Sequence, residues 1–494
     1  MRKSTESTES TESADKRGAA YDTLLLFYII FIRRCYDSGE CSRCLKDIRN
    51  ERTGKRMPKG KTRLFLVRGL IAAGILGVLL FTLYKVAFDP YRGSAKDLEP
   101  TLALTESMPA GEALEDLDYI RQKIMERHPA AMAGLPPAMA EAYAEEKAWL
   151  LGREEVTSAE LWRSAARFLE SLGDAHTRAV HYAETVPSLP VIFQFRDGEL
   201  LASGSGLTLE PVRLISGVPV AELQDRFARH YSHELEGYLR FMFARSISQQ
   251  NYQVLLDLPL EEPSLTLADD REISLAWQES PPAEEADRSF VRYSFDEELS
   301  LAVFTLDSCR MNEEYRETLK EFFREVRDRG IRNVAVDLRQ NSGGNSAVAG
   351  EFLRYIDTPE LSHGGTRTRM GPILFTNKAF TEKNRIIAEF KYQGPVYILT
   401  SPVTFSAAVD FAATFSDNSL AQVVGRIPGN MPASYGDIIN FQTPHAKLYF
   451  SVSYKYFMRS QEALNSEPLI PDLDVPEGEA LDAVKRLIRQ GSRR

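Results

Sequence analysis

The chain has 494 residues but little cysteine, and three of its four cysteines crowd near the N-terminus. These three are Cys35, Cys41 and Cys44, while Cys309 stands alone in the remainder of the chain. No disulfide framework can therefore hold the larger part of the chain together. The spacing of Cys41 and Cys44 is typical of half a metal site, but no second pair completes four ligands, so we expect no metal.

An excess of positive charge is also missing. The formal net charge is -10, which makes nucleic acid an improbable partner. The charge is uneven, because the first seventy residues are basic and the acidic excess follows them. A hydrophobic content of 43% and a charged content of 26% are ordinary for a globular protein. The length allows two or three domains.

Long hydrophobic runs are absent except over residues 64–88, where Gly69–Tyr84 carries no charge. The alternative is a buried core helix, but a glycine-rich segment that is apolar all round favours a transmembrane anchor. Basic residues gather before it, so the positive-inside rule predicts a single-pass protein of the cell membrane, with a cytoplasmic N-terminus and an extracytoplasmic remainder. No small-residue cleavage site is obvious, which favours an uncleaved anchor over a removed signal peptide.

The N-terminal segment is unusual in composition. Residues 4–13 repeat Ser, Thr and Glu, a pattern typical of disorder. Met57-Pro-Lys-Gly-Lys61 would make a normal start for a signal anchor. Our hypothesis is that translation begins at Met57 and that residues 1–56 are not native. Recovery of upstream residues by N-terminal sequencing would contradict it.

Composition and periodicity divide the chain into six parts. The apolar spacing predicts helices through the fourth part, short alternating strands in the fifth, and strands alternating with helices in the sixth, which indicates a β-α-β layered domain. The parts are a disordered basic segment (1–63), the anchor (64–88), a proline-containing linker (89–111), a helical domain (112–185), a small α/β middle module (186–285) and a layered core (286–490).

Ser406 is the strongest candidate for chemistry. It lies in Thr404-Phe-Ser-Ala-Ala408, between an apolar run that predicts a strand and an Ala- and Phe-rich run that predicts a helix. A serine at such a turn is exposed at the end of a sheet, beside the free N–H groups of the helix start. The alternative is an ordinary helix N-cap, which the segment alone does not exclude.

Three other motifs accompany this serine. Gly173-Asp-Ala-His-Thr177 places His176 in a turn, where it is either a general base or a surface histidine. Asp337-Leu-Arg-Gln-Asn-Ser-Gly-Gly344 follows a predicted strand and offers bare N–H groups for an oxyanion or phosphate, or is a plain glycine turn. Without a following Lys-Ser/Thr it is not a nucleotide-binding P-loop. Leu469-Ile-Pro-Asp472 predicts a turn before a strand.

In this order the motifs resemble the tail-specific (C-terminal processing) serine peptidase family. The resemblance covers roughly residues 112–475 and implies a crotonase-like (ClpP-like) β-α-β layered peptidase core. It also implies a reduced PDZ-like middle module, where Ile215-Ser-Gly-Val-Pro-Val220 is similar to a family turn. The five matching segments, in the family's order, are Gly173–Thr177, Asp337–Gly344, Thr404–Ala408, Val424–Gly429 and Pro471–Val475.

The resemblance implies hydrolysis of polypeptides through an acyl-enzyme, without a cofactor. Ser406 would be the nucleophile, and the amides of Gly343, Gly344 and Ala407 would form the oxyanion hole. Many members of the family use a lysine near the position where this chain has Met431, so the resemblance favours the tricorn-like Ser/His branch over the Ser/Lys branch. That branch implies His176 as the base and Glu467 as the nearest acid, although Asn465 also falls close.

Two other functions compete with a membrane-anchored serine peptidase. The missing lysine, and Arg426 in place of the usual glutamate after Val-Gly, motivate a catalytically inactive peptide-binding or envelope-sensing protein on the same fold. A crotonase-type acyl-CoA enzyme is the third, and it is disfavoured because an exported domain would not meet that cofactor.

Overall fold

The structure is a computed structural model that describes residues 73–279 and 289–491. The chain divides into two compact units, Met1–Phe81 and Thr82–Arg494. Within the described ranges no helix is both long and apolar enough to cross a membrane. The first part of the expected span, residues 64–72, lies outside them, as do the repeat, Met57 and the three N-terminal cysteines. Residues 73–83 are helical.

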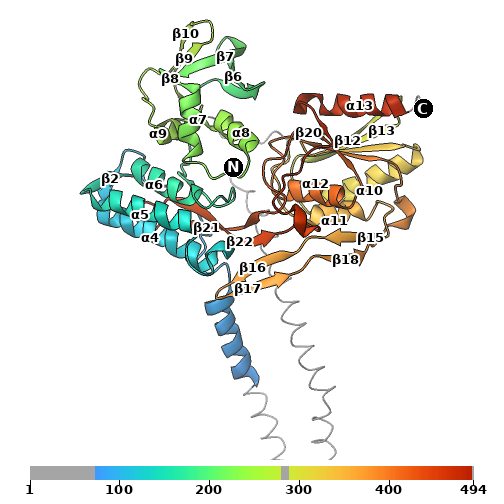
Figure 1. The fold of residues 1–494 in the computed structure, drawn as a ribbon, viewed down its shortest axis with the longest axis horizontal. Helices are drawn as coiled ribbons and strands as arrows, with labels where there is room; N and C mark the ends of the chain where they lie inside the picture. The colour runs from blue at the N-terminus through green and yellow to red at the C-terminus, as the bar shows by residue number, and fades with distance from the viewer. Residues whose placement is uncertain (1–72, 280–288, 492–494) are drawn as a thin grey trace, which may run out of the picture. The chain divides into compact units, whose positions relative to one another are not determined.

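The larger unit is built around a six-stranded sheet (Figure 1). Neighbouring strands run parallel except for the antiparallel edge pair β12 and β13. Parallel strands buried on both faces need continuous apolar runs, and all five residues of β19 are buried accordingly. In order across the sheet the strands are β12 (Val291–Asp296), β13 (Leu301–Leu306), β14 (Asn333–Asp337), β19 (Val396–Thr400), β20 (Gln422–Gly425) and β23 (Leu473–Asp474).

Helices cover both faces of this sheet. On one face α10 (Glu313–Asp328), α11 (Ala347–Leu353) and α12 (Ala407–Asp417) share a core with Val334, Val336 and Ile398. On the other face α13 (Ala480–Gly491) packs on Leu301, Ala335 and Leu399. The alternation of side chains along each strand divides the two cores. The mixed α/β layered fold is therefore confirmed.

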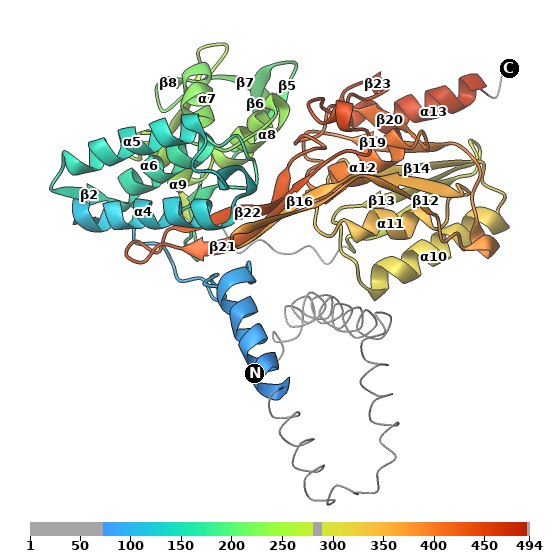
Figure 2. The same cartoon turned by 60° about the horizontal axis from the view of Figure 1, so that its bottom comes forward.

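A second sheet joins the helical part of the chain to this layered core. The helices α4 (Ala110–Arg127), α5 (Pro137–Leu151) and α6 (Ser158–Glu170) share a core with β21 (Tyr435–Gln442) and β22 (Tyr449–Phe457) (Figure 2). Strand β22 also pairs with β16 (Thr366–Met370) and with β3 (Ala179–Val180). The Gly173–Thr177 motif lies between α6 and β3, so this sheet fixes its position.

The middle module is a small α/β unit with its own core. That core also includes Phe405, the residue before Ser406. The module thus packs directly against the turn that contains Ser406. Its main elements are β5 (Ile192–Arg196), β6 (Glu199–Gly204), β7 (Leu207–Ile215), α7 (Val220–Ala228), α8 (Glu236–Ser246), α9 (Gln250–Leu255), β9 (Ser264–Leu267) and β10 (Glu272–Ser274).

The remaining strands are short or lie at edges. They are β1 (Ser107–Pro109), β2 (Glu155–Thr157), β4 (Pro187–Ser188), β8 (Val218–Pro219), β11 (Gln278–Glu279), β15 (Glu360–His363), β17 (Ile373–Asn377) and β18 (Phe380–Lys383).

Asp116 on α4 ties the helical part to the loop between β21 and β22. Its buried carboxylate accepts hydrogen bonds from the hydroxyl of Thr443 and the N–H groups of His445 and Ala446. Replacing it in Asp116→Ala leaves buried donors without an acceptor, at about 1–3 kcal/mol for each. We expect the free energy of unfolding, measured by denaturant titration, to fall by about 3 kcal/mol.

Glu115→Ala is the matched control. Glu115 also bonds His445, but its side chain is 71% exposed. An exposed pair contributes about 0–1 kcal/mol. Equal losses in the two variants would contradict the role given to Asp116.

Candidate active site

Ser406 stands at the turn from β19 into α12, in a strained backbone conformation. Its φ is 55° and its ψ is -124°, a region that residues other than glycine rarely adopt. Although it holds the N-cap position, its side chain makes no capping hydrogen bond. Its own N–H instead donates to Oδ1 of Asn430 at 2.6 Å. The helix-cap alternative therefore fails, and the hydroxyl is left available.

The loop Asp337–Gly344 is hydrogen-bonded to this turn. The N–H of Phe405 donates to the carbonyl of Asn341 at 3.0 Å, and the hydroxyl of Thr404 donates to the carbonyl of Leu338 at 2.8 Å. These bonds link the ends of neighbouring parallel strands β14 and β19. The Asp337–Gly344 and Thr404–Ala408 motifs, which lie far apart in the sequence, are thus joined in the structure.

Glycine is required at position 343 because the loop passes close to the serine. A Cβ atom there would lie 2.7 Å from Cβ of Ser406 and 3.1 Å from N of Ala407, and φ is +101°. The N–H of Gly343 donates to Oδ1 of Asn341 at 2.8 Å. Among the described residues, neither the N–H of Gly344 nor that of Ala407 has an acceptor. These two donors remain available on the residues that directly follow Gly343 and Ser406.

His176 is brought to the same turn from the helical part of the chain. Its ring packs on that of Phe405, with 4.6 Å between centroids. Its carbonyl accepts a bond from the hydroxyl of Ser451 on β22 at 2.6 Å. Both ring nitrogens are buried without a hydrogen-bond partner, and none joins the ring to Ser406. Burial lowers the pKa of His176.

Asp174 fixes the histidine loop. Its Oδ1 accepts the N–H of His176 at 2.9 Å, and its Oδ2 pairs with Nε2 of His128 at 3.2 Å. Oδ2 also accepts from the hydroxyl of Thr177 at 2.5 Å. Burial works to raise the pKa of Asp174, but the bond and charge of His128 hold it well below its ordinary value. Asp174 is therefore a carboxylate, with Oδ1 3.8 Å from Nδ1 of His176.

Glu234, from the loop before α8, joins the histidine loop to the loop that supports Ser406. Its Oε1 accepts the N–H of Ala175 at 3.3 Å, and its Oε2 accepts that of Met431 at 2.9 Å. Burial, with the charge of Asp174, raises the pKa of Glu234 to about 8. Sequence reasoning missed this residue because it belongs to none of the recognised motifs. Only the tertiary contacts reveal it.

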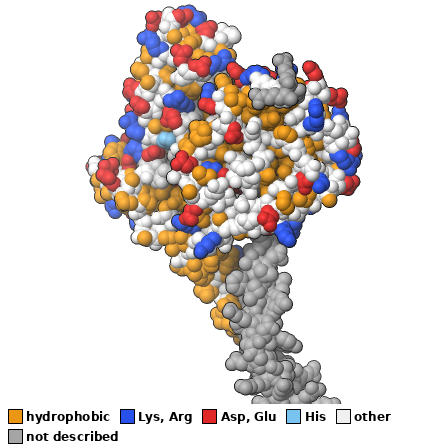
Figure 3. Space-filling model, turned by 45° about the vertical axis from the view of Figure 1, so that its right-hand side comes forward, with side chains coloured by type: hydrophobic (Ala, Val, Ile, Leu, Met, Phe, Trp, Pro, Cys, Tyr) orange, Lys and Arg blue, Asp and Glu red, His pale blue; other side chains and the backbone are white. Residues whose placement is uncertain are grey.

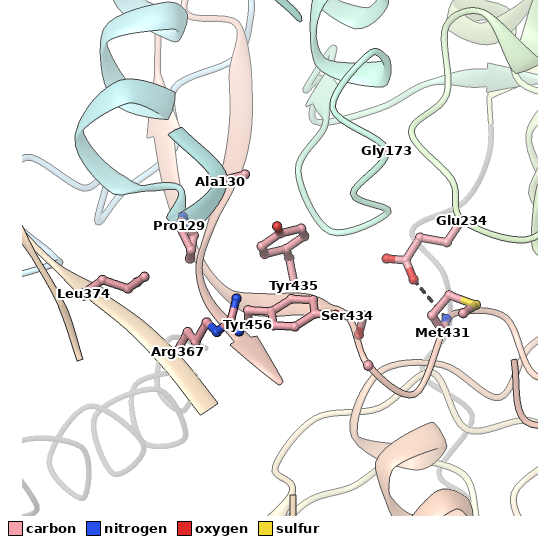
Figure 4. Close-up of a pocket in the computed structure, with 11 residues that line it drawn as sticks. Pro129, Ala130, Gly173, Glu234, Arg367, Leu374, Met431, Ser434, Tyr435 and Tyr456 are labelled. Atoms are coloured by element: carbon pink, nitrogen blue, oxygen red, sulfur yellow. Dashed lines mark hydrogen bonds between the residues drawn. The ribbon is translucent and has the colours of Figure 1, made fainter. Parts of the chain in front are cut away.

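A pocket of about 450 Å³ opens beside this cluster. Glu234 and Met431 lie at one end of it, and Leu374 and Arg367 at the other (Figure 4). Its position beside the cluster makes it a candidate for the substrate side of the site. The other lining residues are Pro129, Ala130, Gly173, Ala433, Ser434, Tyr435 and Tyr456.

The structure does not bring Glu467 to the histidine. Glu467 is exposed, and no hydrogen bond or ion pair in the described part of the chain joins it to His176 or Ser406. The nearby Asn465 accepts the N–H of Arg459 at 2.8 Å. Arg426 pairs with Asp474 at 2.9 Å, which explains a cation after Val-Gly in this chain.

Residues 300–475 match the model of peptidase family S41. These residues form a serine-type peptidase domain of family S41. The matched region contains β13 through β23, and with them Ser406 and the glycine loop. The resemblance to tail-specific peptidases is thereby confirmed, and a polypeptide is the substrate class of this S41 enzyme.

Two solved structures of CPAF share the fold over most of this chain. Mature CPAF is 14% identical with a TM-score of 0.60, and the match covers 77% of this chain and 97% of that chain. Mature CPAF complexed with lactacystin gives the same identity and TM-score, with 77% and 98% covered. The photosystem II D1 C-terminal processing protease is 12% identical over 77% of this chain and 98% of that chain, with a TM-score of 0.43.

Gly343→Ala should disable this site without unfolding the protein. The new Cβ would clash with the Ser406 turn, so we expect kcat/KM toward an internally quenched peptide to fall by about 100-fold or more. Gly350→Ala is the control, because that helical position has open space around its Cβ. A folded Gly343→Ala protein with wild-type activity would contradict the placement of the loop.

Proposed function

We propose that the protein is a membrane-anchored endopeptidase that cleaves extracytoplasmic polypeptides through an acyl-enzyme on Ser406, with His176 as general base. The observation that carries the proposal is the strained turn at Ser406. Its hydroxyl makes no cap, two N–H groups beside it lack acceptors, and the unpartnered imidazole of His176 packs on the adjacent Phe405. This arrangement joins a nucleophile, anion donors and a base.

The reaction would proceed by the usual steps of acyl transfer. His176 accepts the proton of the Ser406 hydroxyl as Oγ attacks the peptide carbonyl carbon. The resulting oxyanion is stabilised by the N–H groups of Ala407 and Gly344, each contributing about 3 kcal/mol. The C–N bond then breaks and the amine leaves with the proton from His176. Water, activated by the same histidine, hydrolyses the acyl-enzyme.

In our proposal Gly343 donates no hydrogen bond to the oxyanion, because its N–H already donates to Asn341. Its role is to let the loop pass close to Ser406. The acid that orients His176 would be Asp174 instead of Glu467. Asp174 is ionised and 3.8 Å from Nδ1, whereas Glu467 is exposed and makes no contact with the ring. A shift of about 1 Å would bring Asp174 within hydrogen-bonding distance of that nitrogen. This arrangement belongs to a Ser/His peptidase and needs no lysine.

The anchor and location rest on separate observations. Residues 73–83 form a helix whose large apolar side chains are mostly more than half exposed (Figure 3). Such a surface favours a hydrocarbon environment. Together with the basic residues before it, it supports a single-pass protein whose peptidase domain faces away from the cytoplasm. We also propose a crotonase-like core and a reduced PDZ-like middle module, which the mixed sheet and the small module would suit.

A fluorophosphonate probe tests the nucleophile directly. The full-length protein should be labelled, because the probe reacts with an activated serine. Ser406→Ala should abolish labelling, and His176→Ala should slow it by at least about 100-fold, since loss of general base catalysis costs that much. Labelling is measured by in-gel fluorescence, with circular dichroism to verify folding. His181→Ala, which removes another buried histidine, should label normally.

Equal labelling of the wild type and Ser406→Ala would exclude Ser406 as the nucleophile. A wild type that stays unlabelled while folded would favour the peptide-binding function without catalysis.

The pH dependence of kcat/KM should show a base with a lowered pKa. Burial lowers the pKa of His176, while Asp174 and Asp437 raise it and Arg178 lowers it. The neutral imidazole is the active form, so activity is retained below the ordinary value of about 6.5 and is lost as the pH falls through the lowered pKa. Asp174→Asn removes a charge that raises this pKa, so the acid limb should move to still lower pH.

Peptide hydrolysis measured from about pH 4 to pH 8 gives this limb. His445→Ala is the control, since that partly exposed histidine contacts Glu115 and none of the site residues in the described hydrogen bonds. An acid limb above about pH 7 would contradict a buried neutral histidine as the base.

A further inference from the structure

The catalytic histidine has two acidic neighbours with metal-binding geometry. One ligand atom from each of Asp174, His176 and Glu234 lies within 4.8 Å of the other two. Asp174 and His176 come from the loop after α6, and Glu234 comes from the loop before α8. The cluster is thus assembled from two parts of the fold.

A second observation makes this cluster more than an acidic patch. The side chain of His176 is only 10% exposed, and both of its ring nitrogens lack a partner. A buried polar atom without a partner costs about 1–3 kcal/mol. A ligand that accepts a lone pair from this ring would recover that energy.

We propose that Asp174, His176 and Glu234 bind a divalent transition-metal ion, Zn²⁺, and that the bound ion inhibits the peptidase. One imidazole nitrogen and two carboxylate oxygens are a common ligand set for zinc, with water as the fourth ligand. The imidazole disfavours Mg²⁺ and Ca²⁺, which prefer oxygen. The inhibitory part rests on the proposed function, whereas binding of the ion does not.

The ligand atoms must approach one another for the ion to bind. Zinc binds nitrogen and oxygen at about 2.0–2.2 Å, so tetrahedral ligands lie roughly 3.4 Å apart. The widest separation in the cluster, at most 4.8 Å, would therefore shrink by up to about 1.4 Å. Glu234 can supply this movement, because each of its oxygens accepts only one backbone N–H in the structure. Asp174 is more firmly held, with three bonds to its two oxygens.

The cluster itself supplies the charge that favours a cation, because two of its three ligands are carboxylates. The charged or titratable groups that face it are His128, which bonds Asp174, and Arg178 and Asp437, which act on His176.

Coordination explains how the ion would inhibit. An imidazole that donates its lone pair to zinc cannot accept the proton of Ser406. Inhibition should therefore be reversible by a chelator. It requires no covalent change in the protein.

Isothermal titration calorimetry with ZnCl₂ tests the site. The full-length chain carries Ser406→Ala, to prevent self-cleavage, and Cys35→Ser, Cys41→Ser and Cys44→Ser, to remove thiol ligands. We expect one zinc site, and its affinity should fall by at least about tenfold in Glu234→Gln and also in His176→Ala. Two variants are used so that the test still works if one of them fails to fold. Circular dichroism confirms that each is folded.

His445→Ala in the same background is the matched control. His445 contacts Glu112 and Glu115 at the surface and could bind zinc adventitiously. Affinity that depends on His445 and is unchanged in both folded cluster variants overturns the proposed site, and so does an absence of binding.

Fluorophosphonate labelling of wild-type protein tests the inhibition. Zinc should suppress labelling, EDTA should restore it, and MgCl₂ should have no effect. Zinc that binds the cluster without changing the labelling rate overturns the inhibitory role. If Ser406 is never labelled even with EDTA, the proposed function fails, and the calorimetry still decides whether the metal site exists.

Discussion

The left-handed backbone at Ser406 is the constraint on which the whole site depends. A residue other than glycine in such a conformation costs on the order of 1–3 kcal/mol, so the surrounding structure must hold it. Asn430 receives its N–H, the carbonyl of Asn341 receives the next N–H upstream, and Gly343 leaves room for the turn. Asn430 is itself held, because its Nδ2 donates to the carbonyl of Met431 and to Ser434. In this conformation the Ser406 hydroxyl makes no helix cap, and α12 begins directly after Ser406.

His176, the proposed base, is placed near Ser406 by tertiary packing and not by the sequence around the serine. β22 holds the histidine loop by the bond from Ser451, and the ring of Phe405 supports His176. Phe405 also belongs to the core of the middle module. Glu234 completes the connection by bonding both loops. Movement of the middle module would therefore shift both His176 and Ser406. This connection offers the fold a physical route for regulation.

The sequence was sufficient for the layered core and for the strand-to-helix turn that contains Ser406. Buried parallel strands such as β19 are continuous apolar runs, and the motif around Ser406 is local. The second sheet was missed because the pairing of β22 with β16 and with β3 joins segments that lie far apart in the sequence. Glu234 was missed for a related reason, since its partner Met431 lies 197 positions away. The choice of Glu467 came from family spacing alone, and tertiary contacts point to Asp174.

A crystal structure of the protein after reaction with a small phosphonate tests the central claim most directly. The account predicts phosphorus bonded to Oγ of Ser406, with the phosphoryl oxygen about 3 Å from the N–H groups of Ala407 and Gly344. It also predicts that a ring nitrogen of His176 moves within hydrogen-bonding distance of the ester oxygen. An adduct on another residue, or an adduct on Ser406 with His176 turned away and another side chain in its place, would contradict the account.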